Sequence, residues 1–121
     1  MQDQDLFKHF EDNQFFAAGQ IIFREGETGE VFYLVAEGEV DISTGHHQLE
    51  TVGPGGILGE LALIDKKPRS ATVTARTDCL LTVIDREHFL ALIQRTPLFA
   101  LQVMRVMADR LRRTTDQLRS K

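Results

Sequence analysis

Short apolar runs separated by glycines fill the chain from about Gln14 to Ile84, and this pattern limits the possible folds more than any other feature. Runs such as 21–23 and 31–36 have the length of single strands, and 71–75 alternates small apolar residues with threonine, as a half-buried strand does. Glycines between the runs supply the positive φ angles that tight turns need. Many short strands with no long helix between them predict a sandwich or a jelly-roll barrel.

The pattern changes at Asp85, after which the sequence indicates helix almost to its end. Asp85 is a suitable N-cap for a short helix through about Gln94. Thr96 is followed by a proline, which is favoured at the first position of a helix. A second helix is therefore predicted over 97–119, about 35 Å long at about 1.5 Å per residue.

Size and composition fit one small globular domain. The 121 residues are 42% hydrophobic and 26% charged, a balance that supports a core and argues against disorder. We therefore expect a single domain over residues 1–121, with the β-rich part at about 12–84 and the helices at about 85–119. The net charge of -4 is unfavourable for direct nucleic-acid binding, and no apolar run approaches the ~20 residues that cross a bilayer.

Cysteine and histidine usage favours a cytoplasmic protein that is not an enzyme. The single cysteine, Cys79, lies in an apolar stretch and predicts a buried strand thiol. The acidic, polar residues 1–5 do not resemble a signal peptide. The histidines are scattered, with no carboxylate placed to orient one for catalysis, and the adjacent His46 and His47 are expected to be solvated rather than metal-bound. No catalytic residue, metal or cofactor is predicted.

The segment 53–71 has the residue types of an anion site. A glycine-rich approach leads to a short helical turn at 61–63 and then to a strand that opens with arginine. Gly59 lets the backbone come close to a ligand, and the unpaired amides that open the turn attract an anion. Arg69 offers a charge-assisted, bidentate bond to a phosphate. Glu60 would repel a phosphate alone, so its presence suggests that the ligand also carries a hydroxyl donor, as a ribose 2′-OH does.

The residue types alone leave two interpretations about equally open. The segment is either a nucleotide site or a surface loop that closes a barrel. The P-loop pattern and the GxGxxG dinucleotide pattern are both absent, so neither of these phosphate-binding motifs competes.

Two motifs in this segment resemble the phosphate-binding cassette of the cyclic nucleotide-binding domain family: Gly59-Glu60-Leu61-Ala62-Leu63 and Pro68-Arg69-Ser70-Ala71. That family includes the bacterial catabolite activator protein, the regulatory subunits of protein kinase A and cyclic-nucleotide-gated channels. The glycines that fall at the family's β-roll turns are Gly19, Gly26, Gly29 and Gly38. The resemblance extends from about Leu6 to Leu118. It implies a mainly β fold with flanking helices, in which an eight-stranded β-roll precedes a short helix and a long C-terminal helix.

The resemblance also implies roles for single residues. Glu60 would accept a hydrogen bond from the ribose 2′-hydroxyl, and Arg69 would pair with the cyclic phosphate. Ser70 would contribute its hydroxyl and its amide. The residues with backbone contacts to ribose and phosphate would be Gly59, Leu61, Ala62 and Ala71. Leu58 departs from the pattern, since many members carry phenylalanine there, and we interpret this as a packing change.

The C-terminal helix has residues at alternating steps of three and four, the spacing of a two-stranded coiled-coil seam. The seam residues are Met104, Met107, Leu111, Thr114 and Leu118. A parallel homodimer is therefore predicted, and the alternative is a helix that packs only on its own barrel. The apolar residues expected to pack on that barrel are Phe99, Leu101 and Val103.

Thr114 and Thr115 resemble the Thr-Ser pair by which the central helix of the catabolite activator contacts adenine, although Thr114 also suits a polar register-setting position. A threonine hydroxyl donates and accepts, so it can bond the N6 amino group and a ring nitrogen. Ser70 agrees, because members that prefer cGMP often carry threonine there. cAMP is therefore favoured over cGMP.

The expected function is a cAMP-sensing regulatory module whose C-terminal helix responds to the ligand. Two alternatives stay open. The chain is the sensor half of a DNA-binding transcription regulator whose helix-turn-helix part is absent from it, or it is a ligand-free dimerisation module. Glu60 and Arg69 argue against the second alternative, because a module without a ligand has no use for them.

Overall fold

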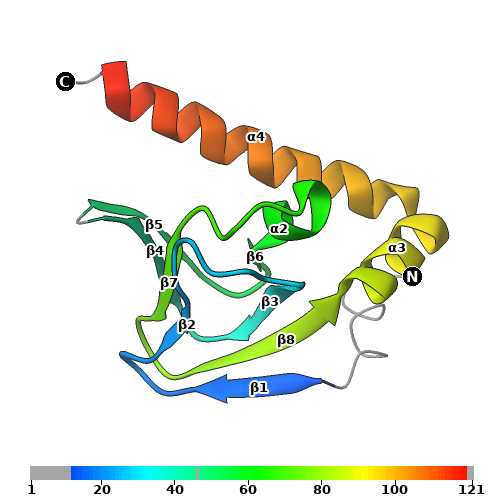
Figure 1. Cartoon of the computed structure of the whole chain (residues 1–121), viewed down its shortest axis with the longest axis horizontal. Coiled ribbons are helices and arrows are strands. Elements are labelled where there is room, and N and C mark those ends of the chain that lie inside the picture. The colour runs from blue at the N-terminus through cyan, green and yellow to red at the C-terminus, as the bar shows by residue number, and fades with distance from the viewer. Residues whose placement is uncertain (1–11, 46, 120–121) are drawn as a thin grey trace.

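The computed structural model describes residues 12–45 and 47–119, which are mainly β, with one short helix within the β-rich part and two helices after it (Figure 1). The strands are β1 (Asn13–Phe16), β2 (Ile21–Phe23), β3 (Val31–Glu37), β4 (Val40–Thr44), β5 (His47–Val52), β6 (Ile57–Leu58), β7 (Thr72–Ala75) and β8 (Cys79–Asp85). The helices are α2 (Glu60–Asp65), α3 (Arg86–Arg95) and α4 (Pro97–Arg119). The predicted fold class, a β-roll followed by a short and a long helix, is confirmed.

Two antiparallel four-stranded sheets form the β-roll, with strand orders β1-β8-β3-β6 and β2-β7-β4-β5. Apart from the consecutive strands β4 and β5, neighbours in each sheet are distant in sequence, so the chain passes repeatedly between the sheets, as in a jelly roll. In Figure 1, α4 extends across one side of the β-roll, and α2 lies between α4 and the strands. This arrangement brings the segment after β6 close to the C-terminal helix.

Alternating residues of the strands build the core between the sheets. In β7 the buried positions are Val73 and Ala75, and in β8 they begin with Cys79 and Leu81. The thiol of Cys79 is buried, and its Sγ lies 3.1 Å from the carbonyl oxygen of Glu39. The prediction of a buried strand thiol is confirmed.

A second apolar cluster attaches the helices to β3 and β8. The rings of Phe32, Phe89 and Phe99 lie with centroids 5.2–6.4 Å apart, and Val103 continues the cluster along α4. Phe99 and Val103 therefore pack on the barrel as predicted. The prediction for Leu101 is wrong, since its side chain is 41% exposed. Leu101 lies about 200° around the helix from Phe99 and Val103, on the opposite face.

Asp85 ends β8 and caps α3, as the sequence predicts. Its carboxylate accepts a hydrogen bond from the backbone N–H of His88 at 2.9 Å, and the His88 ring nitrogen lies 2.7 Å away. The backbone bond is the main reason why the pKa of the Asp85 carboxyl lies below its ordinary value. Within residues 12–45 and 47–119, no helix has the length and apolar character needed to span a membrane.

Candidate functional site

A cavity of about 550 Å³ lies between the β-roll, α2 and the second half of α4. Its volume is within the range of about 300–1,000 Å³ typical of small-molecule sites. The apolar lining includes Phe23, Ile42, Leu49, Leu58, Val73, Met107 and Leu111. The charged lining residues are Glu50, Glu60, Arg69, Arg110 and Arg113. Mostly apolar walls with a few convergent charged groups favour a ligand that has both an apolar and an ionic part.

The structure brings most of the predicted site residues to this cavity. Those that line it are Gly59, Glu60, Leu61, Arg69, Ser70 and Ala71. Ala62 and Thr114 lie in α2 and α4, but their side chains are outside the described part. Thr115 is exposed and does not line the cavity, and its hydroxyl donates to the carbonyl oxygen of Leu111 in the same helix at 2.9 Å. Of the two threonines predicted to contact the base, Thr115 is thus not brought to this cavity, and the prediction for the Thr114 side chain lies outside the described residues.

Backbone carbonyls hold Arg69 in place. Its side chain is buried (the residue is 6% exposed), and the guanidinium donates to the carbonyl oxygens of Gly59 at 3.1 Å and Val31 at 2.8 Å. The guanidinium carbon also lies 4.2 Å from the centre of the Phe23 ring, a cation–π contact. Burial lowers the pKa of the Arg69 guanidinium from its ordinary value. These contacts orient the guanidinium through uncharged groups, so they do not neutralise its positive charge. That charge is still available to an anion in the cavity.

Two glycines leave room for the Arg69 guanidinium. A Cβ on Gly29 would lie 2.1 Å from Nε of Arg69, and a Cβ on Gly59 would lie 2.5 Å from Nη1. Gly59 also has a φ of 80°, the left-handed conformation that glycine adopts without strain, where it caps α2. The 24–30 loop is fixed to the same arginine, since the N–H of Gly26 donates to the Arg69 carbonyl at 2.8 Å.

Glu60 presents a buried carboxylate to the site. The residue is 2% exposed, and its Oε1 accepts a hydrogen bond from Nη1 of Arg110 at 2.8 Å. Its Oε2 is buried and has no hydrogen-bond partner among the described residues. A buried polar atom without a partner costs about 1–3 kcal/mol. Oε2 of Glu60 is therefore the natural acceptor for a hydroxyl donated by a ligand.

Arg110 connects three elements around the cavity. Its Nε donates to Glu50 on β5 at 2.6 Å, its Nη1 to Glu60 on α2, and its Nη2 to the carbonyl of Ile57 on β6. Glu50 also pairs with Arg113, with Nη2 of Arg113 3.0 Å from Oε2 of Glu50. Glu50, Arg110 and Arg113 were not predicted as site residues from the sequence. Arg110 lies 60 positions from Glu50 and 50 from Glu60 in sequence. These contacts therefore form only when α4 packs against β5 and α2.

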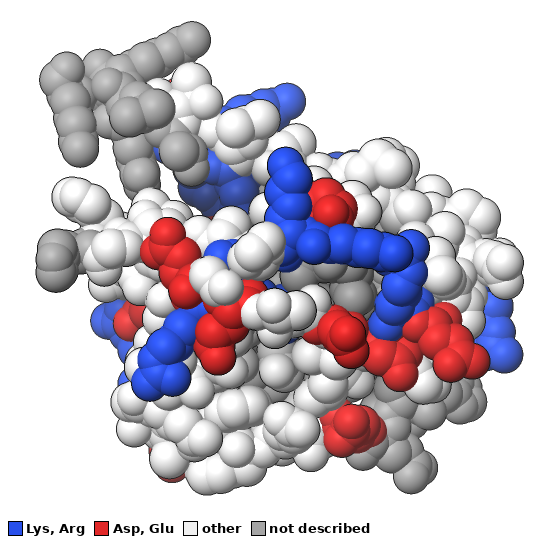
Figure 2. Space-filling view, in the orientation of Figure 1, with Lys and Arg blue, Asp and Glu red and all other residues white. Residues whose placement is uncertain are grey.

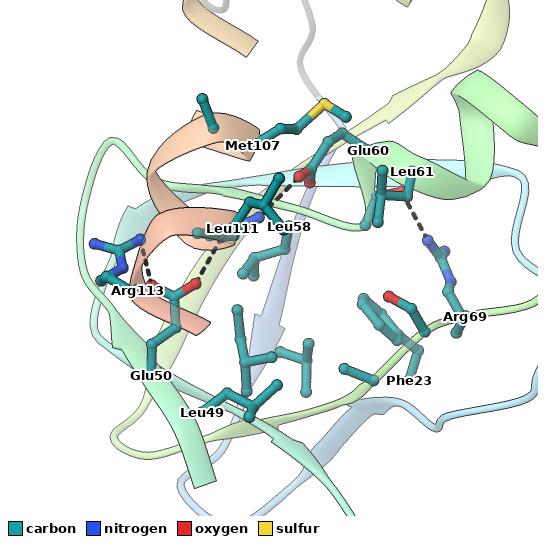
Figure 3. Close-up of a pocket in the computed structure, with 17 residues that line it drawn as sticks. Phe23, Leu49, Glu50, Leu58, Glu60, Leu61, Arg69, Met107, Leu111 and Arg113 are labelled. Carbon is teal, nitrogen blue, oxygen red and sulfur yellow. Dashed lines mark hydrogen bonds and ion pairs between the residues drawn. The ribbon is translucent and has the colours of Figure 1, made fainter. Parts of the chain in front are cut away.

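The charged groups of the cavity lie at opposite sides. Figure 3 shows Arg69 above Phe23 on one side, Glu50 and Arg113 on the other, and Glu60 with Leu61 along the upper wall. A ligand with an anionic group, a neighbouring hydroxyl and a flat apolar part fits this order of groups. On the face shown in Figure 2, acidic and basic side chains are interspersed.

The sequence is similar to those of known cyclic nucleotide-binding proteins. The profile of the cyclic nucleotide-binding domain matches residues 13–96. The cyclic AMP receptor protein of Thermus thermophilus is 36% identical over 116 residues, which cover 92% of this chain and 54% of that protein. A cAMP-dependent protein kinase regulatory subunit of Eremothecium gossypii is 45% identical over 71 residues, covering 59% of this chain and 16% of that protein. The chain thus spans about half the length of the first relative and less of the second.

Comparison with solved structures agrees. The crystal structure of Thermus thermophilus catabolite activator protein superposes with a TM-score of 0.83 at 36% identity, covering 95% of this chain and 56% of that one. The cAMP bound PfPKA-R structure superposes with a TM-score of 0.79 at 24% identity, and the match covers 95% of this chain and 46% of that one. At this lower identity the second likeness supports the fold alone.

Proposed function

The chain belongs to the cyclic nucleotide-binding domain family, and on that premise we propose that it binds cAMP in the cavity beneath α4 and acts as a regulatory module. The observation that carries the proposal is the pairing of two buried groups on the cavity wall. Arg69 is an oriented cation, and Glu60 has an oxygen without a partner among the described residues. A cyclic phosphate next to a ribose 2′-hydroxyl satisfies both groups at once.

The proposed pose follows the order of groups in the cavity. The cyclic phosphate lies against Arg69, the 2′-hydroxyl donates to Glu60, and the base extends toward Leu111 on α4 (Figure 3). Ser70 and the backbone around Gly59 line the phosphate side and are proposed to bond the phosphate and ribose. A ligand of about 22 heavy atoms at about 0.3–0.4 kcal/mol each gains about 7–9 kcal/mol, which corresponds to roughly micromolar affinity.

The choice of cAMP over cGMP is supported by the names of two relatives, a cyclic AMP receptor protein and a cAMP-dependent protein kinase regulatory subunit. Thr114 and Thr115 remain the proposed contacts to adenine. Because Thr115 is exposed on α4 and outside the cavity of its own chain, we assign its contact to the adenine bound by a second copy.

A second copy has a suitable surface on α4. Exposed apolar side chains recur there at steps of three, four and three: Leu101, Met104, Ala108 and Leu111. Met104 is 60% exposed and Leu111 69% exposed, and a row of exposed apolar side chains along one helix face is typical of an interaction surface. This spacing supports the predicted homodimer. Met107, predicted in the same seam, instead packs toward the β-roll and lines the cavity.

The proposed output is a shift of α4, because this helix supplies both a wall of the cavity and the dimer seam. A ligand moves such an equilibrium only by its differential affinity for the two helix positions. We place this module in the cytoplasm, where the buried thiol of Cys79 stays reduced.

Calorimetric titration tests the proposed site. The wild type and the Arg69→Ala variant are titrated with cAMP, cGMP and a cyclic dinucleotide. We expect micromolar or tighter cAMP binding, weakened in Arg69→Ala by at least about 2 kcal/mol, the scale of one charged hydrogen bond. Arg76→Ala is the matched control, because Arg76 pairs with Asp41 outside the cavity. Unchanged cAMP binding in Arg69→Ala contradicts the site, and tighter binding of cGMP than of cAMP contradicts the adenine assignment.

A further inference from the structure

Four side chains of alternating charge form a continuous row from the surface of α4 to the ribose side of the cavity. Arg113 pairs with Glu50 at 3.0 Å, Glu50 with Arg110 at 2.6 Å, and Arg110 with Glu60 at 2.8 Å. Figure 3 shows these contacts as dashed lines that meet between α4, β5 and the start of α2. The row ends at Oε2 of Glu60, which has no hydrogen-bond partner in the described part of the chain.

Burial increases along this row. Arg113 is exposed, Glu50 and Arg110 are largely buried, and Glu60 is almost fully buried. Solvent screens the outer ion pair most and the inner pairs least. The two inner pairs, Glu50–Arg110 and Arg110–Glu60, are therefore the strongest electrostatic contacts of the row, and the position of each side chain depends on its charged partner.

The two oxygens of Glu60 have different surroundings. Arg110 donates to Oε1 and so restricts the rotation of the buried carboxylate, which limits the directions that Oε2 can face. Arg110 is in turn oriented by Glu50 at Nε and by the carbonyl of Ile57 at Nη2. Without the Glu50 carboxylate, the guanidinium keeps its charge but loses its shortest carboxylate contact, so its orientation toward Glu60 is held less strongly.

We propose that Glu50 is a positioning residue for ribose recognition: through Arg110 it sets the direction in which Oε2 of Glu60 receives the 2′-hydroxyl. The inference rests on the proposed function, since it concerns the same cavity. Glu50 lies on β5 and its partners lie on α4, so the contact also makes the ribose site sensitive to where α4 lies.

Nucleotides with and without the 2′-hydroxyl separate this role from a structural one. cAMP and 2′-deoxy-cAMP are titrated calorimetrically into the wild type and into Glu50→Gln. In the wild type we expect cAMP to bind at least about tenfold more tightly, the size of one hydrogen bond to a charged group. In Glu50→Gln we expect cAMP affinity to fall about tenfold and 2′-deoxy-cAMP affinity to change less than about twofold, so the preference for the 2′-hydroxyl largely disappears.

Two further variants keep the result interpretable. Glu37→Gln changes an exposed strand glutamate of β3 and should leave both affinities at the wild-type values. Glu50→Asp keeps the charge but shortens the side chain, so it should show the same selective loss, and it replaces Glu50→Gln if that variant does not fold. An equal loss for both nucleotides, or no loss for either, overturns the positioning role. If the wild type binds neither nucleotide, the proposed function fails together with this inference.

Discussion

The substitution Gly29→Ala tests whether the position of the Arg69 guanidinium matters as well as its presence. The added Cβ would lie 2.1 Å from Nε and 2.2 Å from Cζ of Arg69, so the guanidinium must move. The backbone of Gly29 does not have the left-handed φ that an alanine would resist. Since the clashing atoms are the end of a flexible side chain, the protein should fold with the arginine displaced.

The size of the effect follows from the two bonds that hold the guanidinium, to Gly59 at 3.1 Å and to Val31 at 2.8 Å. A hydrogen bond to a charged group contributes about 1.5–3 kcal/mol. If displacement breaks one of them, the free energy of unfolding should fall by about that amount. A misplaced guanidinium also loses one charged hydrogen bond to the cyclic phosphate, about 2 kcal/mol, so cAMP affinity should fall about thirtyfold.

Calorimetric titration with cAMP and urea unfolding measure the two effects. Gly53→Ala is the control, because a Cβ there meets no atom within 4 Å and its φ is also outside the left-handed region. Both variants restrict the unfolded chain equally, so that contribution cancels between them. If Gly29→Ala binds cAMP within about threefold of Gly53→Ala, the close fit around Arg69 does not control ligand binding.

Three other changes address the dimer, the core and the helix cap. Met104→Glu with Leu111→Glu should convert a dimer to a monomer in sedimentation, because charges replace the exposed apolar face of α4. Phe99→Ala should lower the free energy of unfolding in urea by about 3–5 kcal/mol, because it leaves a cavity in the aromatic cluster. Asp85→Ala should lower it by about 1 kcal/mol at neutral pH through loss of the α3 cap. The pKa of Asp85 is lower in the folded protein than in the unfolded chain. The difference in free energy of unfolding between the wild type and Asp85→Ala should therefore be complete above the ordinary pKa of aspartate, and it should disappear as the pH falls through the lower pKa of the folded protein.

Each of these three predictions has a control variant and a result that would contradict it. Phe15→Glu changes an exposed residue of β1 and should leave the dimer intact, and a dimer that survives the double α4 variant excludes that seam. Leu98→Ala, at an exposed site next to Phe99, should change stability by less than about 0.5 kcal/mol, and an equal loss at Leu98 and Phe99 contradicts the packing assignment. A loss in Asp85→Ala that persists unchanged in acid excludes the carboxylate cap.

Local signals were enough to predict much of the fold and part of the site. The cap at Asp85 and the helix from Pro97 to Arg119 depend on a few neighbouring residues, and the structure has them as predicted. The cavity residues from Gly59 to Ala71 are close in sequence, so a single motif was sufficient to bring them together.

The errors and omissions share a physical cause. A helix with apolar residues on more than one face does not reveal from periodicity which face packs on its own chain, so Leu101 and Met107 were assigned to the wrong faces. Glu50 and Arg110 carry no local signal, because their contact forms only when α4 folds back over β5. Long-range ion pairs of this kind need the three-dimensional structure.

The two sides of α4 have a thermodynamic consequence. Leu111 lines the ligand cavity and is also among the most exposed apolar residues of the proposed seam. One rigid helix cannot turn toward the ligand without turning relative to a partner. Coupling between two binding events is reciprocal. If bound cAMP changes the self-association constant by some factor, self-association changes the affinity for cAMP by the same factor. Protein concentration then acts as an effector of the nucleotide site, and the apparent affinity for cAMP should change as the protein is diluted through its dimer dissociation constant.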